Sequence, residues 1–171
     1  GPFMDYLPKI RNMGYSFCIQ HTLTPYGTEL EPGLPPKKLL LQNLCRLGDA
    51  WSPLPLAWRY DPVIVDATHP VEWHLEQFDR MCKILSGKVN RCIFSFLDIY
   101  PNRMKAGSFS SVPKPTMYRL ADGFSKSAAA CGIPLFTCAE EIDLSPLGIS
   151  RGACIDPLWI SQISGKSLSY K

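Results

Sequence analysis

The sequence predicts one α/β domain with parallel strands, either a partial (βα) barrel of the TIM type with about four or five units or an open doubly wound sheet. Strand-like apolar segments alternate with amphipathic helical patterns, and this unit recurs about every 40 residues. At 171 residues the chain is shorter than a closed barrel, which takes about 250 residues. We therefore expect residues 1–171 to form a single domain that is a fragment of a longer barrel protein.

Four segments rich in β-branched and aromatic residues are typical of strands buried on both faces. They are 15–24, 55–65, 89–100 and 133–144. A short fifth strand is expected at 152–156. Because each segment is separated from the next by a helical pattern, the connections favour a parallel sheet.

The helical patterns are apolar residues spaced three or four apart, which form one face of a helix. The first follows Pro35 and Pro36, residues suited to a first helical turn. The stripes consist of Leu40, Leu44, Leu47 and Trp51; of Val71, Leu75, Phe78, Cys82 and Leu85; and of Met117, Leu120, Phe124, Ala128 and Cys131. Trp159, Ile160 and Ile163 predict a last helical turn.

Charged and polar side chains gather where the predicted strands end. Arg59 and Asp61 are two residues apart, so they share one face of their strand, and Pro62 then helps to end regular pairing. The carboxyl edge of a parallel sheet is the usual place of active sites in such folds. The catalytic candidates are Arg59, Asp61, Asp98, Glu140 and Asp143. The candidates for binding a substrate or cofactor are Gln20, Thr22, Ser95, Glu141 and Asp156.

The residue types leave the chemistry of this edge open. Carboxylates bind hard divalent cations, and they also act as general acids and bases. Buried carboxylates need counter-ions, which Arg59 and Arg91 or Arg151 would supply, and the same charges could merely cap the sheet as ion pairs. No metal ligand set is assigned. No phosphate-binding glycine loop and no C-x-x-C pair occurs, and we expect the seven cysteines to be mostly packed, reduced thiols.

Charge and hydropathy limit the expected partners. A formal net charge of +3 is too small to indicate a nucleic-acid or membrane surface, and no apolar run resembles a signal peptide or a membrane span. We expect a cytoplasmic protein that binds a small molecule. The missing flanking segments of the same protein are a second expected partner, and exposed strand edges would allow self-association. We expect His74 to be packed or hydrogen-bonded, which is also the simpler interpretation of His21.

Five stretches carry a resemblance over essentially the whole chain: "TLTPYGTELEP", "WRYDPVIV", "EWHLEQFDRM", "CIFSFLDIY" and "TCAEEIDLSPLGISRGACID". Together they resemble an uncharacterised bacterial family known only as a domain of unknown function. Its longer members resemble radical S-adenosylmethionine enzymes of the spore photoproduct lyase group, with a C-x3-C-x2-C motif near the C-terminus. The resemblance implies a 4Fe-4S cluster and S-adenosylmethionine in those longer members.

This chain lacks that cysteine motif, so no cofactor is expected within it. The leading interpretation is the central barrel portion of a radical S-adenosylmethionine-like enzyme, inactive on its own. One alternative is a hydrolase or lyase that uses the same carboxylates with a divalent metal. The other is a non-catalytic binding module in which Arg59 and the acidic residues only tie the sheet together.

Overall fold

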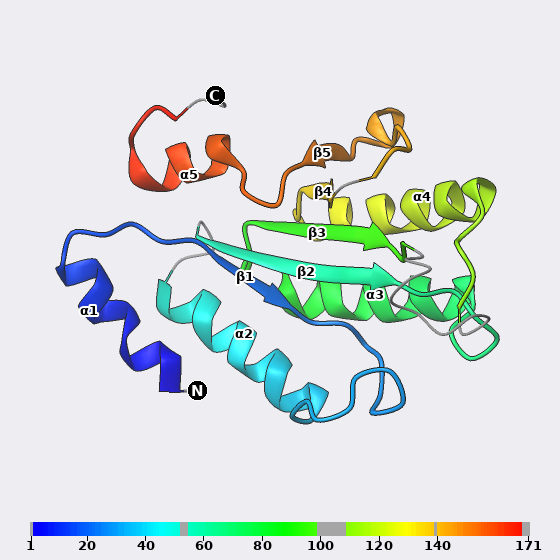
Figure 1. Cartoon of the computed structure of the whole chain (residues 1–171), viewed down its shortest axis with the longest axis horizontal. Coiled ribbons are helices and arrows are strands. Elements are labelled where there is room, and N and C mark those ends of the chain that lie inside the picture. Colours follow the sequence, from blue (N-terminus) through cyan, green and yellow to red (C-terminus); the bar gives the residue numbers. More distant parts are fainter. Residues whose placement is uncertain (1, 52–54, 99–108, 139, 169–171) are drawn as a thin grey trace.

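The computed structural model describes residues 2–51, 55–98, 109–138 and 140–168, in which strands and helices alternate (Figure 1). The strands are β1 Ile19–Thr22, β2 Leu56–Val63, β3 Arg91–Phe96, β4 Leu135–Cys138 and β5 Ser150–Gly152. The helices are α1 Leu7–Asn12, α2 Lys37–Trp51, α3 Val71–Leu85, α4 Lys114–Ala130 and α5 Pro157–Ser164. Two short 3-10 helices, η1 Pro2–Asp5 and η2 Ser145–Leu147, complete the described elements.

The five strands form one parallel sheet in the order β1-β2-β3-β4-β5. The prediction of a parallel α/β fold is therefore confirmed. Each strand lies beside the strand that precedes it in the chain, as in a (βα) barrel, whereas a doubly wound sheet reverses its order at a switch point. The described sheet contains no such reversal, so the strand order favours the partial barrel.

Helices α2, α3 and α4 pack on one face of the sheet, which we call the outer face. Right-handed crossovers between strands that follow one another in the same direction place their helices on one side. A single apolar cluster joins Trp58 of β2 to residues of all three helices, among them Leu44, Phe78 and Phe124. The ring of Phe78 stacks on Trp58 with centroids 5.0 Å apart and on Phe124 with centroids 4.1 Å apart. This layer is the main hydrophobic core.

A hydrogen-bonded histidine lies inside this core. The Tyr60 hydroxyl lies 2.9 Å from Nδ1 of His74, and Nε2 of His74 lies 2.8 Å from the carbonyl oxygen of Ile64. Burial lowers the pKa of His74, which favours the neutral ring. The prediction that His74 is a packed histidine is confirmed. His21 in β1 differs, because its buried Nδ1 has no hydrogen-bond partner among the described residues.

The opposite face of the sheet, which we call the inner face, packs against α5. Trp159 of α5 is 1% exposed and forms a second apolar cluster with Ala57, Ile93 and Cys138. In Figure 1, α1 and α5 both lie near the ends from which the arrows of β1, β2 and β3 start. The two faces are therefore unequal: α2, α3 and α4 cover the outer face, where Leu7 of α1 joins the same apolar cluster, and the short helix α5 covers part of the inner face.

An ion pair anchors α5 at the amino end of the sheet. Arg91 begins β3, and its guanidinium lies 4.3 Å from the ring centre of Phe136 and 4.6 Å from that of Trp159. Its Nη1 donates to Oδ2 of Asp156 at 2.6 Å. The other carboxylate oxygen of Asp156 accepts from the backbone amides of Leu158 and Trp159, so it caps the first turn of α5.

Two expectations about element bounds were wrong. The fifth strand covers 150–152 rather than 152–156, because Asp156 and Pro157 form the cap and first turn of α5 instead of continuing a strand. The first strand is confined to 19–22 within the predicted 15–24. Helix α1 was not predicted, since its six residues are too few to show a helical period.

Candidate functional site

A chain of polar side chains crosses the inner face from β1 to β3. Arg59 is paired in register with Thr22 of β1 and Ile93 of β3, which places it on the inner face. Its Nη1 donates to Oε1 of Gln20 at 3.0 Å, and its Nη2 forms an ion pair with Asp61. The hydroxyl of Ser95 donates to the other oxygen of Asp61. Sequence analysis predicted all four members of this network, and the structure brings them together.

The carboxyl half of β2 is irregular where this network ends. The pairing of β2 with β3 shifts between Tyr60 and Val63, and the Asp61–Pro62 peptide bond is cis. The hydroxyl of Tyr26 donates to the Pro62 carbonyl at 2.9 Å and accepts from the Ile64 amide at 2.8 Å, so it satisfies backbone groups that leave the ladder. Such bulges are common beside active sites, where they redirect a side chain. Here Asp61 is turned toward both Arg59 and Ser95.

Arg59 and Asp61 are half-buried, with side chains 22% and 18% exposed. Burial opposes the charge of the guanidinium, but the hydrogen bond to Asp61 and its negative charge outweigh that cost and raise the pKa of Arg59. Arg59 therefore remains a cation at any physiological pH. Because its side chain is neither sealed in the core nor fully hydrated, it can contact a ligand from a site of reduced dielectric.

Glu140 lies next to this network, just beyond β4. One of its carboxylate oxygens accepts from the amide of Phe96 at 2.6 Å. Burial raises the pKa of Glu140, and the nearby charges of Asp98 and Asp61 raise it further, whereas the Phe96 amide opposes them. Burial and neighbouring carboxylates that raise the pKa of a carboxyl group are features found around general acids in enzymes. Asp98 itself is exposed.

Three other predicted residues lie farther out. One oxygen of Asp143 accepts from the amide of Ser145 at 3.0 Å, and this hydrogen bond lowers the pKa of the exposed carboxyl. The side chain of Glu141 is exposed, while its carbonyl accepts from Arg151 at 3.3 Å. Thr22 shares the inner face with Arg59 and is exposed. Their assignment to catalysis or binding stays a prediction.

Asp156 does not join the group at the carboxyl edge. We expected it to follow a fifth strand toward that edge, but the chain after β5 returns over the inner face, and Asp156 pairs with Arg91 at the start of β3. Both of its oxygens have partners within the fold. The reason is local, because an aspartate followed by proline at the first helical position forms a helix start.

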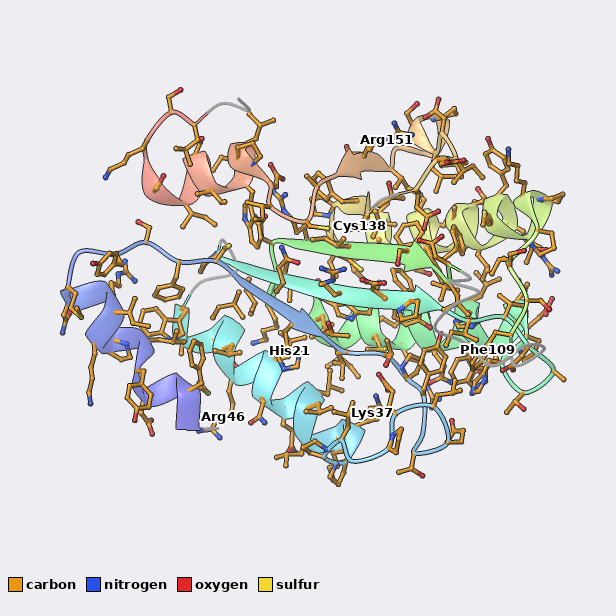
Figure 2. The ribbon with its side chains drawn as sticks, viewed as in Figure 1. His21, Lys37, Arg46, Phe109, Cys138 and Arg151 are labelled. Atoms are coloured by element: carbon orange, nitrogen blue, oxygen red, sulfur yellow. The ribbon has the colours of Figure 1, made fainter. Side chains whose placement is uncertain are left out.

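Sequence reasoning missed two cysteines at this face. The sulfur atoms of Cys138 and Cys154 lie 3.2 Å apart, although the residues are separated by 15 others and by β5. Figure 2 places Cys138 at the sheet and Arg151 farther out by the β5 ribbon. The available signal was the alternation of β4, which puts Cys138 on the same face as Phe136, but nothing in the spacing indicates Cys154 as its neighbour.

A cavity of about 290 Å³ lies elsewhere, toward the amino end of the sheet. It is lined by residues that precede β1 and β2, including Arg11, Tyr15, Phe17 and Trp51, together with Ile163 of α5. The ionised network around Arg59 is not part of its lining. We therefore locate the candidate site by its polar contacts at the carboxyl edge rather than by this cavity.

The arrangement defines a class: a parallel α/β protein whose strand order is that of a partial (βα) barrel, with polar side chains in contact on the inner face toward the carboxyl ends of β1 to β4. The family model described as "Domain of unknown function (DUF1848)" matches residues 1–171, and the chain belongs to this family. Comparison with curated proteins and with solved structures found no match. The expected membership of a family of unknown function is confirmed.

None of the helices in the described part of the chain is both long and apolar enough to cross a membrane. The predicted cytoplasmic location stays a prediction.

The 4Fe-4S cluster implied by the resemblance needs several cysteine thiolates around one point. Within residues 2–51, 55–98, 109–138 and 140–168, Cys138 and Cys154 bring two sulfur atoms together, and no three His, Cys, Asp or Glu side chains are placed to hold one metal ion. The described residues therefore do not fit this cluster. Its ligands would have to come from other residues.

Proposed function

We propose that the inner face around Arg59 is the substrate site of a (βα)-barrel enzyme that acts on a small polar molecule. One observation carries this proposal: the connected network of Gln20, Arg59, Asp61 and Ser95 spans three strands and remains partly exposed. A guanidinium has five donors in a fixed plane and binds carboxylate, phosphate or carbonyl oxygens well. Gln20 and Asp61 orient that plane, so Arg59 is preorganised to bind an oxygen-rich substrate.

In this proposal Glu140 is the proton donor. Its raised pKa favours the acid form, and its hydrogen bond to the Phe96 amide fixes one carboxylate oxygen. Asp61 is the ion-pair partner that keeps Arg59 in place, and Ser95 donates to the second oxygen of Asp61. The site would then bind an anionic or carbonyl group at Arg59 and protonate the reacting atom from Glu140.

We also propose, from the sequence resemblance, that this half-barrel is the scaffold of radical S-adenosylmethionine chemistry in longer members of the family. The sequential parallel strand order supports this proposal, because it is the order of a (βα) barrel. The cluster would be supplied by a cysteine motif outside residues 1–171. The alternative is that the polar network only ties the sheet together and binds no ligand. The following experiment distinguishes this alternative from a substrate site.

The experiment compares residues 1–171 with a longer family member that carries the cysteine motif, both purified without oxygen. We expect iron, sulfide and brown absorbance in the longer protein alone. In that protein the anionic group bound at the arginine equivalent to Arg59 would be the carboxylate of S-adenosylmethionine, so substitution of this arginine by methionine should retain iron but weaken S-adenosylmethionine binding in equilibrium dialysis by about 10- to 100-fold. This range corresponds to a charge-assisted hydrogen bond of about 1.5–3 kcal/mol.

The outcomes separate the proposals. A colourless longer protein without iron overturns the radical chemistry. An iron-loaded variant that binds S-adenosylmethionine as well as the unsubstituted protein overturns the role of Arg59. In residues 1–171, Asp61→Asn should lower stability because Arg59 loses its counter-ion, while the matched exposed substitution Asp143→Asn should leave it nearly unchanged. If the Asp61 substitution in the longer protein changes stability but not binding, the network is only a structural tie.

The sheet edges suggest a partner for this chain. Among the described strands, β1 pairs only with β2, and β5 pairs only with β4. Unpaired edges attract further strands. We propose that flanking segments of the same protein, or a second copy in their absence, pair at these edges. Light scattering should then give a dimer or larger species for residues 1–171 and a monomer for the longer chain, and a monomer in both cases would contradict this.

A further inference from the structure

Cys138 and Cys154 form a close thiol pair whose geometry is unlike that of the other cysteines. Their sulfur atoms are 3.2 Å apart, and a disulfide bond is about 2.05 Å long, so a small movement joins them. The other cysteines differ: Cys82 and Cys92 are buried in the outer layer, where burial raises the pKa of each thiol well above its ordinary value. Among the described residues, the thiol–thiol contact is a specific feature of the inner face.

The backbone around β5 produces this contact. Cys138 is paired in register with Gly152, and a Cβ at Gly152 would lie 2.7 Å from the carbonyl oxygen of Thr137. The strand can approach β4 this closely because residue 152 has no side chain. The chain then turns over the inner face, where Gln20 donates from Nε2 to the carbonyl of Cys154 at 2.9 Å. Contacts from two different strands therefore hold Cys154 above Cys138.

The two thiols differ in access. Cys138 is 6% exposed and packs with Ala57, Ile93 and Trp159. Cys154 is exposed to solvent. Burial and, after it, the neighbouring Cys154 raise the pKa of Cys138 to about 11, and the positive charge of Arg59 opposes these effects only in part. An exposed sulfur can meet an external reagent, and a buried neighbour within reach can then displace that reagent.

We propose that Cys138 and Cys154 are a redox-active dithiol that reduces low-molecular-weight disulfides and closes to an intramolecular disulfide. The site is independent of the substrate site proposed above, since it needs neither a substrate at Arg59 nor a cluster. The exposed Cys154 is the attacking thiol, and Cys138 is the resolving thiol. Closure would covalently link the end of β4 to the segment that leads into α5.

The reaction balances with the disulfide RSSR as the oxidant. The Cys154 thiolate attacks one sulfur of RSSR, whose S–S bond breaks, and one thiolate RS⁻ leaves and takes up the proton that Cys154 released. The Cys138 thiol then loses its proton and attacks the sulfur of Cys154. The bond between Cys154 and the R group breaks, and a second RSH is released. Two electrons have passed from the protein dithiol to RSSR.

The test treats residues 1–171 with oxidised glutathione in excess, followed by alkylation and trypsin digestion. Cleavage after Lys126, Arg151 and Lys166 yields peptide 127–151, which contains Cys131 and Cys138, and peptide 152–166, which contains Cys154. We expect these two peptides to be joined by a disulfide, with five of the seven cysteines still alkylated.

Matched variants assign the bond. Cys138→Ser should abolish the joined peptides and leave glutathione bound to Cys154, whereas Cys131→Ser should leave the joined peptides unchanged. Cys154→Ser removes the other partner of the same bond at an exposed position, where loss of folding is not expected. In this variant the joined peptides should be absent, and Cys138 should carry no glutathione.

Three results would overturn the inference. The first is a protein that retains seven alkylated cysteines after treatment. The second is glutathione that stays on Cys154 although Cys138 is present. The third is a joined peptide pair that survives Cys138→Ser but not Cys131→Ser. Circular dichroism of each variant shows whether it is folded, and the exposed Cys154 substitution keeps the test decisive if Cys138→Ser unfolds.

Discussion

Replacing Asp156 by alanine should detach α5 from the inner face, because this one side chain serves two purposes. One oxygen pairs with Arg91 at 2.6 Å, and the other accepts from the amides of Leu158 and Trp159 at 3.0 and 3.1 Å. The Arg91 side chain is only 8% exposed, so the substitution leaves a buried cation without its anion. The helix would also lose its cap.

The expected cost follows from these contacts. Loss of an N-cap costs about 1 kcal/mol. Breaking a buried ion pair from one side costs about 3–5 kcal/mol. Arg91 keeps its hydrogen bond from Nε to Asn90 at 3.1 Å and the faces of Phe136 and Trp159, so its guanidinium retains partners and the lower end of this range applies. We therefore expect Asp156→Ala to lower the free energy of unfolding by about 4 kcal/mol.

Urea unfolding monitored by circular dichroism measures this change, and fluorescence of the four tryptophans, which include the buried Trp159 of α5, gives a second signal. The matched control is Asp143→Ala, whose exposed carboxylate accepts from one amide and should cost less than about 1 kcal/mol. Adding Arg91→Met to Asp156→Ala should restore part of the loss, since no unpaired charge is then buried. Equal costs for the two alanine variants, or no recovery in the double variant, would refute the reasoning.

Three further predictions concern the outer layer and Glu140. Gly48→Ala places a Cβ 2.3 Å from the Lys88 carbonyl oxygen. The cost of this overpacking, about 1–3 kcal/mol, should exceed the gain in helix propensity of about 1 kcal/mol, so the variant should be less stable. A urea midpoint equal to or above that of the unsubstituted chain would contradict this. Tyr60→Phe removes the hydroxyl beside Nδ1 of His74 and should cost about 1–3 kcal/mol by the same assay, with an unchanged midpoint as the opposing result. Folding raises the pKa of Glu140, so the folded state favours the protonated carboxyl and ionisation of Glu140 destabilises the fold. The stabilisation from the protonated carboxyl is complete below about pH 4.5, the pKa in the unfolded chain, and is lost as pH rises through the pKa in the folded chain. Glu140→Gln should therefore gain stability over the unsubstituted chain at pH 7 but not at pH 4, and a difference independent of pH between these values would exclude this cause.

Local residue patterns were sufficient for the elements and their direction. The apolar stripe through Val71, Phe78 and Leu85 predicted helix α3, because its spacing places these side chains on one face of a helix. The alternation in β2 put Arg59 and Asp61 on one side of the strand, and the recurring strand–helix unit predicted parallel pairing. These inferences worked because they depend on interactions within a few residues along the chain.

The carboxyl edge was predictable for a related reason. Strands that run in parallel bring their ends to one edge, so the sequence could group Arg59, Asp61 and Ser95 without coordinates. It could not show that Gln20 reaches Arg59, nor that Glu140 binds the Phe96 amide, because these contacts depend on how far adjacent strands are staggered. Periodicity assigns a face to a side chain but does not fix the stagger.

Residue patterns alone predict that this chain folds as parallel α/β units with a polar carboxyl edge, since hydrophobic period and strand-end charge are local properties. The path of the chain that returns over the sheet could be seen only in the folded structure. The turn after Gly152 carries Asp156 to Arg91 at the amino end and sets Cys154 on Cys138. Such contacts join residues far apart in the chain, and their partners are selected by close packing of the whole fold rather than by spacing in the sequence.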